Sequence, residues 1–446
     1  MAQPVEKTED EKKYERHNFV ACFCKTLPTT SGKVCNTDYK EMRQAILSDS
    51  YPTTMKTKLI DPRSSLNILK GKCACLSPYL KLELKQPAFD SEKRGEELLQ
   101  LYAMSLIRDV KFVDYDTNPL TIKLKNFFRD VPFMGRKYEG PLISQLLIMN
   151  KQACSKPIDY MTTQETYNEV HSGVVKAKMS LDKPRYIINL RDLAEAVHND
   201  YPVQFYHEAA MWMTKNIPTA LINPYANSPF KGFLCFNLPF ILCQLNKASD
   251  LALQVAWYYK WQVHRGARPE EMAYEVNALD SKHACSYRGM PNSIIFDSFI
   301  LDEVHAVQGN VLLSQAYPEG APAHPSFPAG HACIAGACVT LLKAFFDTDF
   351  KLPNSVVPNS NGSELLPWEG MALTLGNELD KLAENVAFGR AAAGVHFKSD
   401  NQAGLILGES IGLQLLKQCK QEYRLKDFDR NFKWKITTFD GEVITI

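Results

Sequence analysis

The sequence carries no excess of charge of either sign, because 51 Lys and Arg residues stand against 50 Asp and Glu residues for a net charge of +1. Proteins that bind nucleic acid or anionic membranes through a global field are strongly one-signed. The balanced charge therefore argues against nucleic acid and against anionic membranes as binding partners. Any positive field in this protein is therefore local, and a local cluster of cations is where a small anion would bind.

Apolar runs long enough to cross a membrane are also missing. A spanning helix needs about 20 apolar residues, and even residues 331–346 are interrupted by Lys343. The start MAQPVEKTEDEKKYERHNF has no apolar stretch behind basic residues, so no secretory signal is visible. We expect a soluble protein that is cytoplasmic or the processed form of an exported one.

The cysteines have none of the spacings that bind zinc. There are 12, with two C-x-C pairs and no C-x-x-C, which argues against a zinc ribbon or finger. The even count leaves disulfides in an oxidising compartment open. Scattered cysteines in a large chain are more often buried free thiols, and the pattern favours that interpretation.

Alternating strand patterns are scarce, whereas helical periodicity recurs. Residues 93–111 place Leu98, Tyr102 and Leu106 at helical spacing. The closing KITTFDGEVITI predicts a β-hairpin that turns at Asp440-Gly441. Further helices are predicted around 190–214, 247–264, 331–347, 370–388 and 401–418. The sequence thus predicts a mainly α, helical-bundle fold with a short C-terminal β-hairpin.

Segments rich in Pro, Gly, Asn and Ser separate the predicted helices. None is long and polar enough to be a flexible tether, so we interpret them as loops and not as domain linkers. Residues 1–15 are charged and poor in apolar side chains, which predicts a frayed end. The loops are predicted at 216–230, 287–293, 316–328 and 352–364.

Two polar motifs stand at predicted helix ends. In the first, Lys260 precedes a stop formed by Gly266 and Pro269, and Arg268 follows closely. By itself a basic helix end is more often a solvated face or a complement to the helix dipole. In the second, HPSFPAGHA at 324–332 leaves backbone N–H groups uncovered at a helix start beside His331, where an anion would be attracted. A glycine turn with a solvent-facing histidine is the alternative.

The third motif runs from Gly389 to Asp400. It predicts a helix that ends near Arg390, a break at Gly394 and a new helix for which Asp400 is the N-cap. A histidine that acts as a ligand or nucleophile needs its other nitrogen held, usually by a carboxylate, and His396 with Asp400 could provide this. A loop histidine is more often structural. The three motifs together offer cations, a helix N-terminus and two histidines, which is what a tetrahedral oxyanion requires.

In this order and spacing the motifs resemble the vanadium haloperoxidase and acid phosphatase superfamily. Its pattern is Lys followed by Arg-Pro, then Pro-Ser-Gly-His, then Arg-x5-His-x3-Asp. Seven residues separate Lys260 from Arg268, as in the algal bromoperoxidase branch. Algal-type segments include LYAMSLIRDVKF, EGPLISQLLI, PRYIINLRDLAEAVH and YYKWQVHRGARPE. The resemblance implies a haloperoxidase-like helical domain over residues 61–446, preceded by a partly flexible segment, 1–60.

Membership of this family implies a fold with two four-helix bundles and vanadate as cofactor. It implies hydrogen peroxide and a halide, bromide or iodide, as substrates, with hypohalite as the product that halogenates a small organic acceptor. It also implies a homo-oligomer, a dimer or larger. Carried over, the cofactor-binding positions are Lys260, Arg268, Ala329, Gly330, Arg390 and His396, with His396 bonded to vanadium. The catalytic positions are His331 as acid/base, Lys260 as the donor that polarises peroxide, and His324, which tunes the pocket.

One position departs from the family pattern. Ala329 stands where serine is usual, so a hydroxyl that would bond a vanadate oxygen is missing, although Ser326 or water could compensate. Two other functions remain open. One is a phosphatase in which His396 is the nucleophile and His331 protonates the leaving group, and the other is a relative that Ala329 has made inactive.

Overall fold

The computed structural model describes residue 12 and residues 76–128, 140–226, 229–230, 232–280, 291–423 and 432–446. Within these ranges the fold is mainly helical, with three two-stranded antiparallel sheets. The prediction of a mainly α protein is confirmed. The predicted boundary at residue 60 lies outside the described residues. None of the helices in the described ranges is both long and apolar enough to cross a membrane.

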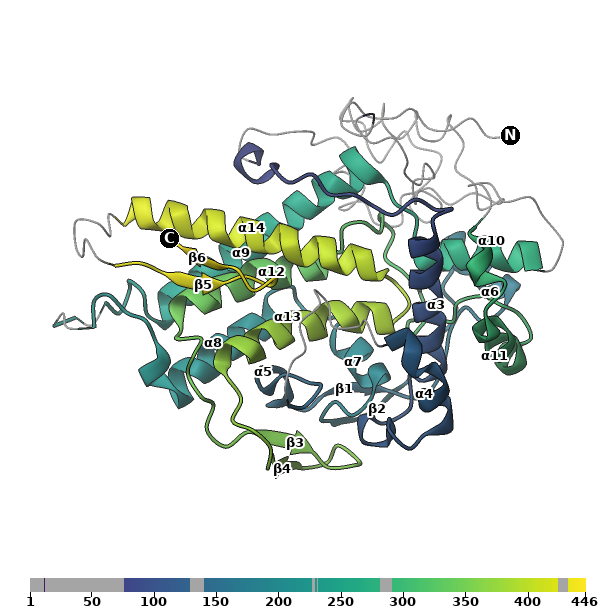
Figure 1. Cartoon of the computed structure of the whole chain (residues 1–446), viewed down its shortest axis with the longest axis horizontal. Coiled ribbons are helices and arrows are strands. Elements are labelled where there is room, and N and C mark those ends of the chain that lie inside the picture. The colour runs from purple at the N-terminus through teal and green to yellow at the C-terminus, as the bar shows by residue number, and fades with distance from the viewer. Residues whose placement is uncertain are drawn as a thin grey trace.

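The larger core is a bundle of four helices (Figure 1). These are α9 (Leu238–Tyr258), α12 (Gly330–Phe345), α13 (Leu375–Ala392) and α14 (Lys398–Glu422). Helix α12 is central, because every residue in it except His331 is buried. Helix α8 (Gln204–Asn216) packs beside α9 and α12. Helices were predicted in each of these segments, although α13 begins five residues later than its predicted start at 370. The single helix predicted over 190–214 is wrong, because the structure has two helices there, α7 (Leu190–Ala196) and α8.

The directions of the four helices bring particular ends together. Side-chain contacts show that α9 and α13 run antiparallel to α12, whereas α14 runs parallel to it. The C-terminal ends of α9 and α13 therefore meet the N-terminal ends of α12 and α14 at one end of the bundle. The contacts are Cys333 with Ala252 and Cys338 with Leu245 for α9, Lys343 with Asp380 for α13, and Gly404 with Ala332 and Gly412 with Thr340 for α14.

Helices α12 and α14 touch through a row of glycines. Gly404, Gly408 and Gly412 lie four residues apart, on one face of α14. A Cβ atom built on Gly408 would lie 2.0 Å from the carbonyl oxygen of Cys333, and one on Gly404 would lie 2.6 Å from that of Ala329. The two backbones are thus in direct contact, and only glycine leaves enough room.

We expect Gly408→Ala to lower the free energy of unfolding by about 1–3 kcal/mol, because the added carbon forces two packed helices apart. Chemical denaturation followed by circular dichroism measures this change. Lys417→Ala, at an exposed position of the same helix, is the control and should change stability by less than about 0.5 kcal/mol. Equal denaturation midpoints for the two variants would contradict the close contact.

A second core packs around α3 (Glu92–Leu106) and shares residues of α13 with the bundle. It includes α7 (Leu190–Ala196), α10 (Pro269–Asp280) and α11 (Phe299–Gln308). The Ser91 side chain caps α3 by accepting a hydrogen bond from Arg94 N. The periodicity predicted this helix correctly but extended it to residue 111. Ala391 and Ala392 belong to this core, whereas Leu382 and Val386 belong to the bundle core, so α13 joins the two.

The remaining elements are short. The helices are α4 (Pro119–Leu124), α5 (Gln145–Ile148) and α6 (Gln164–His171). The strand pairs are β1 (Gln152–Ser155) with β2 (Leu181–Arg185), β3 (Val356–Pro358) with β4 (Leu365–Pro367), and β5 (Lys435–Thr437) with β6 (Val443–Thr445). The C-terminal hairpin is confirmed. The prediction of a loop over 352–364 is wrong for β3, since three residues are too few to show alternation.

Six cysteines lie in the described ranges, and the structure leaves all of them as free thiols. Burial raises the pKa of the Cys154 and Cys419 thiols to about 12. Such thiols stay protonated and act as small apolar side chains. The interpretation as buried free thiols is confirmed for Cys154, Cys333, Cys338 and Cys419, whereas Cys235 is half-buried and Cys243 is exposed.

Candidate oxyanion-binding site

The predicted site residues converge where the four helix ends meet. Lys260 follows α9, Gly330 begins α12, Arg390 lies in the last turns of α13, and Asp400 lies in the first turn of α14. The first backbone N–H groups of α12 have no partner within their own helix, and its dipole adds positive potential. In the first turn of α14, by contrast, Ser399 N already donates to Glu97 Oε1 at 3.0 Å. This end of the bundle is therefore suited to an anion.

The cation after α9 is held inside the protein. Helix α9 widens into a π-helical turn, η7 (Tyr259–His264), which contains Lys260. The Lys260 side chain is fully buried, and its Nζ donates to the carbonyl oxygens of Pro325 and Ser326, each at 2.7 Å. A single turn of π-helix is a frequent feature of functional sites. The two carbonyls fix the ammonium group relative to the loop that precedes α12.

The helix stop differs from the one predicted. The left-handed residue that ends the turn is Arg265, with φ of +45°, and not Gly266. Gly266 has another role, because a Cβ atom there would lie 2.5 Å from Gln86 Nε2. Gly266 thus packs closely against the end of the Gln86 side chain, and the sequence pattern could not distinguish this contact from a helix stop.

Arg268 bridges the two histidines nearest the centre of the site. Its NH1 donates to His396 Nε2 at 2.9 Å and to the Val395 carbonyl at 2.8 Å. Its NH2 lies 3.1 Å from His324 Nδ1, and its Nε donates to the His324 carbonyl at 2.9 Å. Because the guanidinium is buried and planar, it presents one fixed face to the site.

His396 is held by a carboxylate, as predicted. Its Nδ1 lies 3.1 Å from Asp400 Oδ2, and the same oxygen accepts from Phe397 N at 3.0 Å and from the Ser326 hydroxyl. A carboxylate only accepts, so Nδ1 carries the proton and Nε2 of the neutral ring keeps its lone pair. The prediction that Asp400 is the N-cap is wrong. Phe397 is the N-cap, and Asp400 is the third residue of the helix, from which its side chain reaches back.

Both central histidines are neutral. Burial, then Arg268, Lys260 and Arg390, hold the pKa of His396 well below its ordinary value. Burial, then Lys260 and Arg268, do the same for the pKa of His324. The His396 lone pair is therefore available to a Lewis acid throughout the physiological pH range. Arg268 donates to it in this structure, and a group bonded to Nε2 would replace that hydrogen bond.

The start of α12 offers backbone donors without a side-chain cap. Ala329 is the N-cap residue, and no side chain bonds the first N–H groups of the helix. Ala329 N itself donates to the Asp400 carbonyl at 2.9 Å, which ties α12 to α14. Ser326 does not supply the hydroxyl missing at position 329, because its Oγ donates to Asp400 Oδ2 on the Nδ1 side of His396. Gly330 N–H is the donor predicted here.

His331 and Arg390 occupy the side of the site nearer to solvent. The His331 side chain is 28% exposed, and its Nε2 lies 3.0 Å from Asp200 Oδ1. Burial alone would raise the pKa of Asp200, but His331 and Arg390 outweigh it and hold this pKa below the usual range. Arg390 NH1 donates to the Val197 carbonyl at 2.7 Å, while its buried Nε has no hydrogen-bond partner. Sequence reasoning missed Asp200, which is 131 residues from His331 and belongs to no motif.

These donors suit an oxyanion. The set comprises one imidazole lone pair, three buried cations and the uncapped start of α12. The unsatisfied Arg390 Nε calls for an acceptor, since a buried donor without one is costly. Among the residues that the structure describes, no group of three or more His, Cys, Asp and Glu could hold a bare metal ion. Vanadate fits this set, because its metal needs one nitrogen and its oxygens need hydrogen-bond donors.

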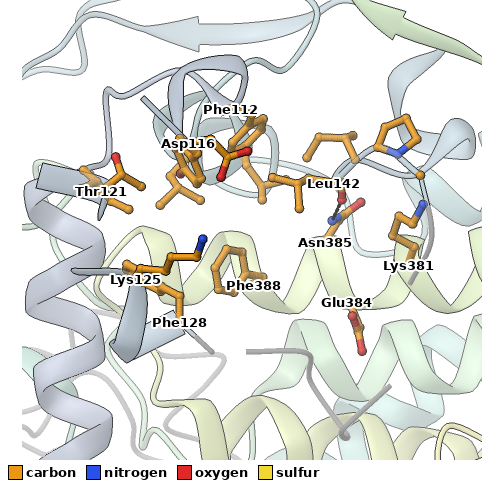
Figure 2. Close-up of a pocket in the computed structure, with 17 residues that line it drawn as sticks. Phe112, Asp116, Thr121, Lys125, Phe128, Leu142, Lys381, Glu384, Asn385 and Phe388 are labelled. Atoms are coloured by element: carbon orange, nitrogen blue, oxygen red, sulfur yellow. Dashed lines mark hydrogen bonds between the residues drawn. The ribbon is translucent and has the colours of Figure 1, made fainter. Parts of the chain in front are cut away.

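A separate cavity of about 470 Å³ lies on the other face of α13 (Figure 2). Phe388 lines it, and because Phe388 and Arg390 are two residues apart on a helix they project to opposite sides. Figure 2 shows Lys125 directed into a space bounded by Phe112, Phe128 and Phe388. None of the predicted site residues lines this cavity. The largely apolar cavity and the oxyanion site are therefore distinct.

A helical bundle with a neutral imidazole, buried cations and the uncapped N-terminus of α12 at the same end has the features expected of an oxyanion-binding protein. A family model described as the VCPO second helical-bundle domain matches residues 241–424. The vanadium-dependent bromoperoxidase of Ascophyllum nodosum is 31% identical over 423 residues, which cover 81% of this chain and 73% of that one. The chain belongs to the vanadium-dependent haloperoxidase family.

Two further comparisons agree with this assignment. The vanadium-dependent bromoperoxidase of Corallina officinalis is 31% identical over 318 residues, and the match spans 65% of this chain and about half (51%) of that one. A solved structure titled as the homohexameric second vanadate-dependent bromoperoxidase from Ascophyllum nodosum superposes with a TM-score of 0.81. It covers 100% of this chain and 87% of the other at 22% identity, which shows that the fold is shared.

Proposed function

We propose that this protein is a vanadate-dependent haloperoxidase that uses hydrogen peroxide to oxidise bromide or iodide to hypohalite, which then halogenates small organic acceptors. The observation that carries the proposal is the neutral His396, whose Nε2 lone pair lies among Lys260, Arg268 and Arg390. The relatives at about 31% identity are named bromoperoxidases, so the phosphatase alternative is not favoured. The homohexameric relative supports the expectation of a homo-oligomer.

In this proposal His396 bonds the metal, and Lys260, Arg268, Arg390 and the Gly330 N–H hold the oxygens of vanadate. Bound vanadate would supply a Lewis acid that activates hydrogen peroxide without changing its own oxidation state. Asp400 and Ser326 act on the far side of the imidazole, where they keep the proton on Nδ1 and the lone pair on Nε2. Ala329 is the N-cap residue of α12 and has no side-chain hydroxyl that could bond vanadate.

His331 is the proposed acid/base. Its position at the more exposed edge allows it to meet peroxide as it arrives, and Asp200 orients the ring through Nε2. The proton removed from peroxide would pass to His331, and the carboxylate would stabilise the resulting imidazolium. Lys260 is proposed to polarise the oxygen that the halide attacks, and two carbonyls hold its ammonium group in place. His324 stays neutral beside Arg268 and tunes the field of the pocket.

The proposal is tested by titrating metal-free protein with vanadate and assaying halogenation and phosphate-ester hydrolysis on the same preparation. We expect halogenation of a phenolic dye that requires vanadate, hydrogen peroxide and bromide or iodide together. Hydrolysis of a phosphate ester should stay at background. Phosphatase activity without halogenation would favour the alternative, and neither activity with bound vanadate would point to an inactive relative.

The substitution Ala329→Ser should tighten vanadate binding. A hydroxyl at the N-cap would restore one hydrogen bond to a charged group, worth roughly ten- to a hundredfold in affinity. Calorimetric titration of wild-type and variant protein with vanadate measures the change. Ala372→Ser, at an exposed position far along the chain, is the matched control. Equal affinity and equal activity in Ala329→Ser and wild type would show that the hydroxyl is irrelevant here.

A further inference from the structure

The turn after α7 contacts both functional groups at the solvent side of the oxyanion site. Val197 accepts a hydrogen bond from Arg390 NH1 at 2.7 Å through its carbonyl oxygen. Three residues later Asp200 Oδ1 lies 3.0 Å from His331 Nε2. The placement of one cofactor-binding cation and of the acid/base therefore depends on the conformation of a single short turn, residues 197–200.

The side chain of His198 anchors this turn to the protein interior. It is only 6% exposed, and its ring stacks on that of Tyr317 with a centroid separation of 3.8 Å and an angle of 4°. His198 Nε2 lies 2.6 Å from Glu319 Oε1, and Nδ1 lies 3.6 Å from Glu195 Oε2 and 3.2 Å from the Asn199 amide nitrogen. Two carboxylates from different segments thus flank one buried imidazole.

Tyr317 connects this imidazole to the site. Its hydroxyl donates to the Ala194 carbonyl at 2.6 Å and accepts from Arg390 NH1 at 3.3 Å. The Arg390 guanidinium carbon also lies 5.3 Å from the centroid of the Tyr317 ring, within the range of a cation–π contact. His198 therefore stacks on Tyr317, and Tyr317 in turn contacts Arg390 at the oxyanion site.

We infer that His198 is a positioning residue, which by stacking on Tyr317 and pairing with Glu319 and Glu195 holds Arg390 and His331 in the geometry that an oxyanion needs. The inference rests on the proposed function for the identity of that anion as vanadate. It assigns to His198 no contact with the cofactor or with the substrates. Its effect passes through the 197–200 turn and through Tyr317.

The charge of His198 makes the inference testable by pH. Burial alone would lower the pKa of His198, but Glu195 and Glu319 outweigh it and raise this pKa to about 8. The other charged or titratable groups nearby are Tyr317, Arg390, Asp200 and His331. Below pH 8 the imidazolium pairs with both carboxylates. As the pH rises through 8 these ion pairs are lost, and the anchor weakens.

The experiment compares vanadate binding to metal-free wild type and to His198→Phe by calorimetry between pH 6 and 9.5. Phenylalanine keeps the ring on Tyr317 but removes both ion pairs. The ratio of the two dissociation constants cancels the ionisation of vanadate itself. We expect His198→Phe to bind about tenfold more weakly at pH 7, the low end for loss of an outer-shell partner. The ratio should fall toward one above pH 9, where wild-type His198 has lost its own charge.

Two further variants control for folding and for generic effects. Glu319→Gln keeps the shape of the site and removes one ion pair, so it should give a smaller ratio with the same pH dependence. His305→Phe, at an exposed position of α11, should have a ratio of one throughout. A ratio for His198→Phe that stays at one, or that does not change with pH, overturns the inference while leaving the proposed function intact. Failure of the wild type to bind vanadate or inorganic phosphate overturns both.

Discussion

Replacement of His396 by alanine should abolish vanadate binding at concentrations that saturate the wild type. The reason is that the proposed function assigns the bond to the metal to His396 Nε2, whereas the surrounding cations can bond only to oxygens. Loss of an outer-shell partner typically costs about 10–100-fold in affinity, and loss of the ligand itself should exceed that range. Vanadate-dependent oxidation of bromide should fall with it to background.

Two further variants and a measurement of folding are the controls for this result. Asp400→Asn leaves the imidazole in place but weakens its orientation, so it should cost about 10–100-fold in affinity and retain activity at high vanadate. His305→Ala changes an exposed histidine of α11 and should behave as wild type. Thermal unfolding of each metal-free variant verifies that the fold persists. Saturable vanadate binding by His396→Ala with near wild-type affinity would show that the metal is held elsewhere.

The second large effect is expected from His331→Ala, which should lower kcat by about 10²–10⁴-fold, the usual contribution of a general acid/base. Vanadate affinity should change only severalfold, because His331 lies at the more exposed edge and the proposed function gives it no bond to the metal. Steady-state oxidation of bromide at saturating vanadate, together with calorimetric titration, separates the two quantities. His396→Ala and His331→Ala therefore predict opposite patterns, loss of binding in one and loss of turnover in the other.

Asp200→Asn provides the graded control for His331. The amide still accepts a hydrogen bond from the ring but carries no charge to stabilise the imidazolium, so kcat should fall by less than in His331→Ala. The pH dependence of kcat should shift in the same variant. If vanadate affinity in His331→Ala fell as far as kcat, His331 would be a binding residue, and the assignment as acid/base would be wrong.

Local sequence predicted the helices of the bundle because their apolar periodicity reflects a buried face. Residues 331–347 predicted α12 almost to the residue, and the glycine at 330 gave its start. The same reasoning misplaced the helix end before Arg268 and the N-cap at Asp400, because the same local residue types occur in several kinds of helix end. Arg265, and not Gly266, adopts the left-handed conformation, whereas Gly266 packs against Gln86, which lies far away in the chain.

The oxyanion site, too, could be predicted from the sequence only in part. By itself the sequence determined that cations, an uncapped helix start and two histidines belong to one site, because they form motifs with a characteristic order and spacing along the chain. Only the tertiary structure decided that the ends of α9, α12, α13 and α14 meet, that Ser326 bonds to Asp400, that Asp200 contacts His331 and that His198 stacks on Tyr317. The physical reason is that side-chain direction and contacts between distant segments follow from packing, and packing leaves no local signature in sequence.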